Sequence, residues 1–555
     1  MVHLNLFVFC ALVYFANNLV TSAVTGSTDD DLIVTLSTGS KVRGHVLQSF
    51  EGNNFHAFES IPYAEPPIGK NRFKPPVIKK PWEGILNATA NDKICPQLLS
   101  HNDPVVIGDE DCLILNVYRP LKTDLQKSLP VFFWIYGGGF DSGYSALYDP
   151  RLLIDYDIVI VTINYRVGSL GFLTTIDDNI PGNVGLKDQL LALQWVHDNI
   201  IAFGGDPNQV TVGGESAGSM SAGFHLLSKA AKGLYSAIIQ QSGSPLAGPF
   251  YPSKDREVAF EFGRQLNKSF NSSRSSDLLA LLQEASLTDI LNLQATFAVG
   301  VRPQGFMATI VFKPVIEEEF NDKAFVTGPM HSAILNGDFN FVPVLIGLNS
   351  EESLMFFDGV DEEAFNQAAK FFDDNTKDII SISLNVAEEA REDVGKALKS
   401  LYTNTSFQED TLGFIKYSSD EVFGRSIIRQ AEGASRYVPV FMYQLSWYNK
   451  NNRFPGTGHA SDLYYLWNLP VGSTSAYNET LRRPILKLWT NFIKYQNPTP
   501  TEDEDLQNVI WPEVTPGSVK YLNIDSTFEV QENPRRYYEI ESILDIYLRE
   551  PLISY

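Results

Sequence analysis

The stretch that determines the fold is Gln209-Val-Thr-Val-Gly-Gly-Glu-Ser-Ala-Gly218. Its start predicts a buried strand, and the residues from Ala217 onward predict a helix. Between them lies the motif G-x-S-x-G, whose glycines let the backbone turn sharply and keep other side chains away from Ser216. A serine on such a strand–turn–helix is typical of a catalytic nucleophile. The helix N-terminus also directs its dipole, and the backbone N–H of Ala217, toward a negatively charged oxygen that forms there.

A run of three glycines stands upstream of this motif, in Tyr136-Gly-Gly-Gly-Phe140. It follows the apolar run Val131–Tyr136, which predicts another buried strand. Consecutive glycines expose backbone N–H groups, and such groups can bind a substrate oxygen. We therefore predict an oxyanion hole formed by Gly138, Gly139 and Ala217, although three glycines alone also suit an ordinary tight turn.

Apolar runs and helical patterns alternate along most of the chain. Helical patterns such as Leu186–Ile200 and Met220–Ser228 lie between short apolar runs without polar alternation, which are typical of strands buried on both faces. This order predicts an α/β fold, with a large, mostly parallel central sheet flanked by helices. The runs are Val131–Tyr136, Ile158–Asn164, Gln209–Val212, Ala237–Gln240, Val342–Gly347 and Val438–Gln444, preceded by short β segments in Ile33–Val42 and Val46–Tyr63.

No linker, repeat or charge block divides the sequence. We therefore predict one α/β domain over residues 24–555, although a chain of 555 residues is long enough for several domains. Helical, polar segments near residues 255–335 and 355–435 are expected to cap the edge of the sheet that carries the site.

The composition is that of a folded globular protein, with 44% hydrophobic and 20% charged residues. It excludes the disordered and low-complexity classes. A formal net charge of −23 repels a phosphate backbone, so we expect no nucleic-acid partner. Three cysteines leave little room for a thiolate metal site, and no metal is predicted.

The first residues are typical of a secretory signal peptide. The apolar run Leu6–Ala16 is too short to span a bilayer, and small residues end this region at Ala23. We predict that residues 1–23 are removed and that the protein is secreted into the extracellular space; an uncleaved anchor is the alternative. No other segment is predicted to span a membrane.

Removal of the leader takes away Cys10 and leaves Cys95 and Cys112. Two cysteines in an oxidising compartment are expected to form a disulfide. Secretion also exposes Asn-x-Ser/Thr sequons to N-glycosylation. Five such sequons are predicted sites: Asn87, Asn267, Asn271, Asn404 and Asn478.

Further motifs extend the pattern well beyond the serine. They are Ile61-Pro-Tyr-Ala-Glu-Pro-Pro67, Glu110-Asp-Cys-Leu-Ile-Leu-Asn-Val117, Asn164-Tyr-Arg-Val-Gly-Ser-Leu-Gly-Phe172, Gly185-Leu-Lys-Asp-Gln189, Phe203-Gly-Gly-Asp-Pro207 and Gln241-Ser-Gly243. With these motifs the sequence resembles the type-B carboxylesterase family, in particular its secreted insect members. That family also includes cholinesterases, juvenile hormone esterases and neuroligins. The resemblance is densest from residue 58 to residue 250, and it implies an α/β-hydrolase fold.

The resemblance also implies the rest of a catalytic triad, in the order serine, acid, histidine. The acid comes from Gly347-Leu-Asn-Ser-Glu-Glu-Ser353, whose register gives Glu352. Because a serine stands at the end of this motif in place of the family's usual glycine, Glu351 stays open as the alternative. The base comes from Gly456-Thr-Gly-His-Ala-Ser-Asp462, which gives His459. Ser242 is implied to be a hydroxyl near the acid.

Other positions are implied to shape the site without reacting. Leu246 and Phe250 are implied to line an apolar acyl pocket, and Glu215 to be a further hydrogen-bonding group. His197 and His225 lie on helical patterns and are interpreted as surface or packing histidines. The family also implies two buried ion pairs, Arg72 with Glu110 and Arg166 with Asp188.

Together these residues predict a serine esterase. It would hydrolyse small-molecule carboxylic esters through an acyl-enzyme on Ser216, with no metal or organic cofactor. The sequence leaves the oligomeric state open.

Three other functions occur within the family. A cholinesterase is disfavoured, because the loop from Cys95 to Cys112 lacks an aromatic residue to bind choline. A juvenile hormone esterase, or another esterase that degrades a specialised signal ester, stays an alternative, although that branch usually has glutamine at the position of Glu215. A non-catalytic, neuroligin-like adhesion protein is disfavoured, because all three triad positions are filled.

Overall fold

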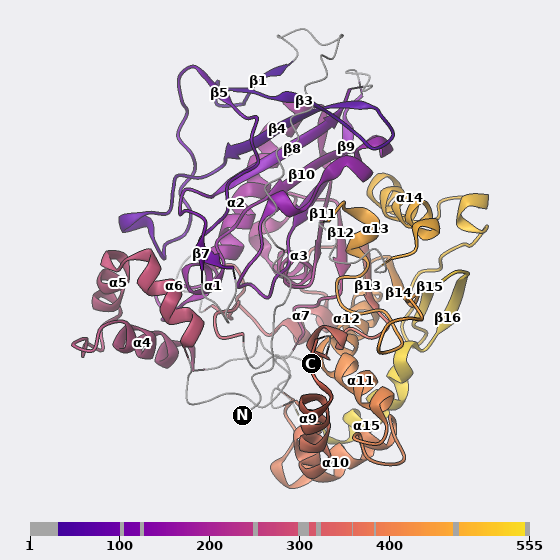
Figure 1. The fold of residues 1–555 in the computed structure, drawn as a ribbon. Coiled ribbons are helices and arrows are strands. Elements are labelled where there is room, and N and C mark those ends of the chain that lie inside the picture. Colours follow the sequence, from indigo (N-terminus) through magenta and orange to yellow (C-terminus); the bar gives the residue numbers. More distant parts are fainter. Residues whose placement is uncertain are drawn as a thin grey trace.

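A computed structural model gives the fold, which Figure 1 shows. It describes residues 32–99, 105–121, 127–247, 254–297, 310–317, 324–357, 359–381, 384–469 and 477–549. The predicted signal peptide, residues 1–23, and Phe250 lie outside the described residues.

An eleven-stranded sheet forms the centre of the molecule. Seven neighbouring strands, from β10 to β15, run parallel to one another, and the strands at both edges are antiparallel. In spatial order the strands are β16 (Phe528–Glu532), β15 (Lys520–Ile524), β14 (Val440–Leu445), β13 (Val344–Asn349), β12 (Ala237–Gln241), β11 (Gly205–Glu215), β9 (Leu129–Ile135), β10 (Val159–Ile163), β8 (Ile114–Pro120), β4 (Asn54–Pro62) and β3 (His45–Gln48).

The predicted architecture is confirmed in its central part. Each of the six apolar runs beyond residue 130 overlaps one of the strands β9 to β14. The residues of β10, β12 and β13 are all buried, as expected for parallel strands covered on both faces.

The two N-terminal β segments are more broken than the sequence suggested. Ile33–Val42 contains two antiparallel strands, β1 (Ile33–Thr35) and β2 (Lys41–Arg43), joined by a turn with Gly39 at a φ of +85°. They belong to a separate small sheet with β5 (Ile85–Asn87). Val46–Tyr63 likewise holds a hairpin of β3 and β4. A third, two-stranded sheet pairs β6 (Gln97–Leu98) with β7 (Val106–Ile107).

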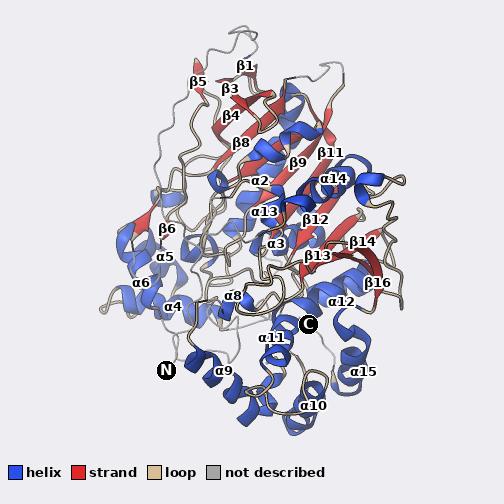
Figure 2. Ribbon diagram, turned by 45° about the vertical axis from the view of Figure 1, so that its right-hand side comes forward, coloured by secondary structure: helices blue, strands red, loops and turns tan. Residues whose placement is uncertain are grey.

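Helices pack on the central strands, and others form two groups at the periphery (Figure 2). α2, α3, α12 and α14 contact the strands directly. One peripheral group holds α4 to α6 and the other α9 to α11 with α15, which agrees with helical content in the two expected cap segments. The helices are α1 (Gly168–Phe172), α2 (Val184–Asn199), α3 (Ala217–Leu227), α4 (Asp255–Leu266), α5 (Ser275–Glu284), α6 (Leu287–Thr296), α7 (Met330–Asn336), α8 (Leu354–Phe357), α9 (Glu362–Asp374), α10 (Glu388–Ser400), α11 (Thr411–Ser419), α12 (Arg425–Ala434), α13 (Leu463–Leu466), α14 (Glu479–Tyr495) and α15 (Tyr537–Tyr547).

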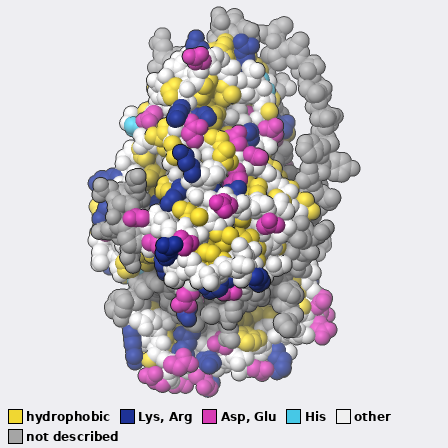
Figure 3. Space-filling view, turned by 90° about the vertical axis from the view of Figure 1, so that its left-hand side faces the viewer, with side chains coloured by type: hydrophobic (Ala, Val, Ile, Leu, Met, Phe, Trp, Pro, Cys, Tyr) yellow, Lys and Arg dark blue, Asp and Glu magenta, His cyan; other side chains and the backbone are white. Residues whose placement is uncertain are grey.

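The predicted disulfide between Cys95 and Cys112 is present, and both cysteines are fully buried. Among the described residues, no helix is long and apolar enough to cross a membrane. On the face drawn in Figure 3, acidic and basic side chains are interspersed with apolar and uncharged ones.

Candidate active site

The predicted site residues converge at the carboxyl ends of five adjacent parallel strands. The glycine run follows β9, Ser216 follows β11 and Ser242 follows β12. The segment with Glu352 follows β13, and the histidine loop follows β14. Open α/β sheets bind their ligands at this edge, so the topology brings together residues more than 300 positions apart.

Ser216 occupies a strained turn between β11 and α3. Its φ of +55° and ψ of −122° are uncommon for a residue with a side chain. The flanking glycines make this turn possible: a Cβ on Gly214 would lie 2.3 Å from the carbonyl carbon of Gly218, and a Cβ on Gly218 would lie 2.0 Å from the Ile135 oxygen. Ser216 itself is half-buried, so part of its surface remains accessible to solvent.

The glycine run lies directly against this turn. A Cβ on Gly137 would lie 3.0 Å from the Cβ of Ser216 and 2.6 Å from the backbone oxygen of Glu215. Gly138 has a φ of +112°, which favours glycine strongly. In the described part of the chain, no hydrogen bond is donated by the backbone N–H groups of Gly138, Gly139 or Ala217. These three N–H groups are the ones that the sequence predicts for the oxyanion hole.

A short polar contact joins Glu352 to His459. Oε2 of Glu352 lies 2.6 Å from Nδ1 of His459. The other carboxylate oxygen, Oε1, accepts hydrogen bonds from the Ser242 hydroxyl at 2.6 Å and from the Asn349 backbone N–H at 2.7 Å. The Glu352 side chain is fully buried, so these three partners fix both of its oxygens.

Glu351, the alternative acid, points elsewhere. Its Oε2 lies 3.5 Å from the Arg535 guanidinium, and its backbone N–H donates to the Thr457 oxygen at 2.9 Å. Burial raises the pKa of the Glu351 carboxyl to about 7. Of the two adjacent glutamates, only Glu352 is paired with the histidine in the described contacts.

The second ring nitrogen of His459 faces a carboxylate that precedes the serine. Nε2 lies 3.1 Å from Oε1 of Glu215, although the angles do not give a hydrogen bond. No hydrogen bond between Ser216 and His459 occurs among the described residues. His459 therefore approaches the turn at Glu215, with Nε2 free of a hydrogen-bond partner.

The electrostatics of this pair follow from burial and proximity. Burial raises the pKa of the Glu215 carboxyl to about 8, against the opposing effect of the His459 charge. Burial alone would lower the pKa of His459, but the carboxylates of Glu215 and Glu352 outweigh it and raise that pKa to about 9. Both groups therefore keep their protons to a higher pH than they would in water.

A buried polar layer supports the histidine loop. Oδ2 of Asp462 accepts hydrogen bonds from the Tyr443 hydroxyl at 2.7 Å and from the Gln241 amide at 2.8 Å. The indole of Trp489 donates to the oxygen of the same amide at 3.1 Å. Burial raises the pKa of Asp462. These contacts attach the loop to β12, β14 and α14.

The remaining predicted residues include one of the two acyl-pocket residues, two histidines and two ion pairs. Leu246 is fully buried after β12, while its proposed neighbour Phe250 lies outside the described residues. His225 is buried against Gln189, and burial lowers its pKa to about 3; His197 is half-buried. Both predicted ion pairs are present, each with a closest distance of 2.6 Å: Arg72 with Glu110 and Arg166 with Asp188.

The five sequons differ in accessibility. Asn87, Asn267, Asn271 and Asn404 are exposed. Asn478 is half-buried, and its Oδ1 accepts a hydrogen bond from the Thr480 backbone N–H at the start of α14.

Sequence reasoning missed the side chains that surround the acid and the histidine from the far end of the chain. Phe423 stacks on the His459 ring, with centroids 4.5 Å apart. Arg535 contacts Asp420 and the backbone oxygen of Ser350. Phe423, Asp420 and Arg535 belong to none of the motifs, so only the fold brings them to the site.

Comparison with known proteins agrees with this arrangement. The sequence profile described as "Carboxylesterase family" matches residues 30–539. The chain is 30% identical over 540 residues to a juvenile hormone esterase from Tribolium castaneum, covering 91% of each chain. It is 32% identical over 529 residues to an acetylcholinesterase from Bungarus fasciatus, covering 89% of this chain and 83% of that enzyme. The family has the α/β-hydrolase fold, which the mostly parallel sheet and its flanking helices share. By its sequence and its fold, this chain belongs to the carboxylesterase family.

Proposed function

We propose that this protein is a secreted serine esterase, which hydrolyses carboxylic esters through an acyl-enzyme on Ser216. Family membership supports carboxylic-ester hydrolysis as the reaction class. The observation that carries the assignment of residues is the 2.6 Å contact between Glu352 and His459, whose Nε2 is left without a hydrogen-bond partner beside the strained serine turn. A histidine held in this way is prepared to accept a proton from a nucleophile.

The reaction follows from these groups. Nε2 of His459 accepts the proton of the Ser216 hydroxyl, whose oxygen attacks the ester carbonyl. The backbone N–H groups of Gly138, Gly139 and Ala217 stabilise the oxyanion that results. His459 then gives its proton to the leaving alcohol. It next takes a proton from water, whose oxygen attacks the acyl carbonyl. The imidazolium returns this proton to the Ser216 oxygen as the bond to the acyl group breaks and the acid is released.

Glu352 and Ser242 act through the histidine in this proposal. Glu352 holds the ring in the tautomer that leaves Nε2 unprotonated, and its charge stabilises the imidazolium. Catalytic hydrogen bonds are often long or misaligned before substrate binds. A small rotation of His459 away from Glu215 and toward Ser216 is therefore part of the proposed cycle.

Steady-state hydrolysis of p-nitrophenyl esters tests this function. The wild-type protein is expected to hydrolyse them, and Ser216→Ala is expected to lower the rate by about 10⁶-fold while the far-ultraviolet circular dichroism spectrum stays unchanged. A folded wild-type protein that hydrolyses no ester would overturn the proposal and favour the neuroligin-like adhesion function.

The relatives favour one second candidate. The likeness to a juvenile hormone esterase over most of both chains supports hydrolysis of a juvenile hormone ester, or of another signal ester. The likeness to an acetylcholinesterase gives weaker support for choline esters as substrates. The loop from Cys95 to Cys112 lacks an aromatic side chain that could bind the choline cation. Rates with a juvenile hormone, acetylthiocholine and simple aliphatic esters, compared as kcat/KM, separate the three.

Secretion is part of the proposal as well. The leader-like sequence, the disulfide and the four exposed sequons all suit an extracellular protein. Expression in cultured insect cells tests this point: the proposal expects the protein in the medium, beginning near Val24 and losing mass on treatment with an N-glycosidase.

A further inference from the structure

The segment that carries Glu352 is tied to a distant helix on both sides of that residue. On its C-terminal side, Ser353 is fully buried. The Ser353 hydroxyl donates to the Ile415 oxygen at 2.9 Å and lies 2.9 Å from the Ser419 hydroxyl, which also accepts from the Ser353 backbone N–H at 3.1 Å. Three contacts therefore join this one serine to α11.

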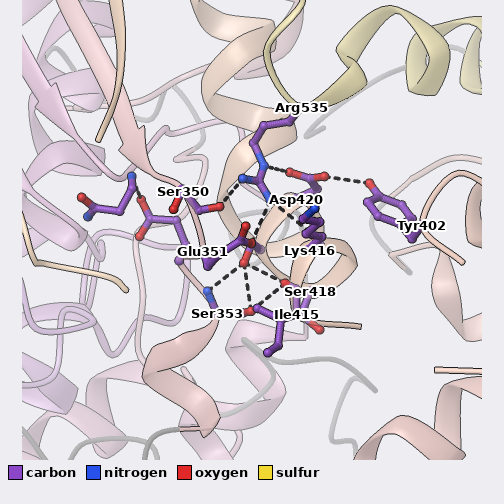
Figure 4. Close-up of polar contacts among 12 residues, drawn as sticks. Ser350, Glu351, Ser353, Tyr402, Ile415, Lys416, Ser418, Asp420 and Arg535 are labelled. Atoms are coloured by element: carbon purple, nitrogen blue, oxygen red, sulfur yellow. Dashed lines mark hydrogen bonds and ion pairs between the residues drawn. The ribbon is translucent and has the colours of Figure 1, made fainter. Parts of the chain in front are cut away.

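On the N-terminal side of Glu352, the link is an arginine (Figure 4). Arg535 donates to Asp420 and to the backbone oxygen of Ser350, and its guanidinium lies 3.5 Å from Glu351. Its side chain is only 7% exposed, so the ion pairs form away from water. Asp420 is held in turn by the Tyr402 hydroxyl at 2.9 Å.

The same helix also reaches the histidine. Between α11 and α12 the chain makes a π-helical turn, Asp420–Gly424, of a kind often found at functional sites. Its first residue pairs with Arg535, and its fourth, Phe423, stacks on the His459 ring at an interplanar angle of 25°. The turn thus contacts His459 directly and the Glu352 segment through Arg535.

We propose that Ser353, Ser419 and Arg535 are positioning residues, which clamp the Glu352 segment onto the helix that carries Phe423 and so hold the Glu352–His459 pair in register. The inference rests on the proposed function, because it assigns these residues to the alignment of the proposed acid and base. A glycine, which is usual at this position in the family, could keep the backbone contact to Ser419 but would lack the two contacts that the Ser353 hydroxyl makes.

The helix supplies a matched control. Ser418 and Ser419 are neighbours, both are buried, and each hydroxyl donates to the backbone oxygen four residues earlier at 2.8 Å. In the described contacts only Ser419 touches Ser353. Each of the variants Ser418→Ala and Ser419→Ala therefore removes one hydrogen bond of the same type within the helix. Only Ser419→Ala also removes contacts to Ser353.

The experiment measures kcat, KM and the melting temperature of the full-length secreted protein. We expect Ser353→Ala and Ser419→Ala each to lower kcat by about tenfold, with KM changed less than about twofold, because a small misplacement of catalytic groups slows the chemical step rather than binding. Ser418→Ala should keep the wild-type kcat. The double variant Ser353→Ala/Ser419→Ala should lose little more than either single variant, since the two serines act as one unit.

The outcomes separate this inference from the proposed function. If Ser353→Ala and Ser419→Ala keep the kcat of Ser418→Ala in an active esterase, the clamp is wrong and the proposed function stands. The two variants could instead lose kcat only because their melting temperature falls, with an equal fall in Ser418→Ala. In that case the serines stabilise the fold without positioning the pair, and the clamp is also wrong. A wild-type protein without esterase activity overturns the proposed function, and this inference with it.

Discussion

The Nδ1 atom of His459 lies 2.6 Å from the Oε2 atom of Glu352, in loops that follow the neighbouring parallel strands β14 and β13. The contact occupies one ring nitrogen and directs the other toward the turn that carries Ser216. Nε2 lies 3.1 Å from Glu215, the residue before the serine. The imidazole is therefore held between two buried carboxylates, which sets both its orientation and its affinity for protons.

Replacing the two adjacent glutamates one at a time tests which of them is the acid. Glu352→Gln removes the charge that stabilises the imidazolium and favours the wrong tautomer, so we expect kcat to fall by about 10⁴-fold. In Glu351→Gln the amide oxygen can still accept a hydrogen bond from Arg535, and Arg535 keeps its ion pair with Asp420. We therefore expect kcat to fall less than about tenfold. Ester hydrolysis rates give the ranking, and the opposite ranking would assign the acid to Glu351.

The pH dependence of kcat/KM tests the contact between Glu215 and His459. Proton transfer needs a neutral imidazole, so the rate rises as pH increases through the pKa of His459. The Glu215 carboxylate contributes to raising this pKa, so Glu215→Gln should lower it and move the rising limb to lower pH by about one unit.

Glu351→Gln serves as the control for this profile, because its carboxylate faces Arg535 and not the histidine. Its rising limb should coincide with that of the wild-type enzyme. If the rising limb of the Glu215→Gln profile stays in place or moves to higher pH, Glu215 does not raise the pKa of His459.

The parts of the fold that the sequence predicted are those with local signals. The strands β9 to β14 are short apolar runs, and the serine turn is a five-residue motif, so both can be recognised without knowledge of distant contacts. The strand β8 was missed because Asn116 interrupts its apolar run; the structure buries this amide against Ser145 and Thr162. The edge strand β16 was missed because four of its five residues are exposed.

The surroundings of the triad had no such signal. Arg535 lies 115 positions from Asp420 and 185 from Ser350, and only the folded chain joins them. The contact between Glu215 and His459 was only partly anticipated, as a hydrogen-bonding role for Glu215. Its effect on the pKa of His459 depends on burial and on a distance of 3.1 Å, which no spacing in the sequence encodes.

The disulfide between Cys95 and Cys112 should contribute measurably to stability. It closes a loop of 17 positions, which corresponds to about 3 kcal/mol in the chain-entropy description. We expect the Cys95→Ser/Cys112→Ser double variant to lose about this much free energy of unfolding in denaturant titrations. Thiol labelling of the unreduced, denatured secreted protein should find no free cysteine, and two labelled thiols would contradict both the bond and the extracellular assignment.

The acyl group that the enzyme prefers should be neutral and of short to medium length. Leu246 is fully buried after β12, and no charged residue occurs between Ser242 and Tyr251. A charged acyl group would lose hydration without gaining a partner, whereas each methylene that fits should gain about 0.8 kcal/mol. A p-nitrophenyl ester series from acetate upward, with one dicarboxylic monoester, measures this as kcat/KM. Preference for the anionic or the longest acyl group would contradict the expectation.

Covalent labelling of the nucleophile tests the central claim most directly. The secreted protein is treated with a fluorophosphonate, digested with trypsin, and the peptide from Asp188 to Lys229, which contains Ser216, is sequenced by mass spectrometry. The account predicts one phosphonyl group per chain on Ser216, loss of ester hydrolysis in proportion to labelling, and neither labelling nor hydrolysis in Ser216→Ala. Full ester hydrolysis with an unlabelled Ser216, or a label on another residue that abolishes activity, would contradict it.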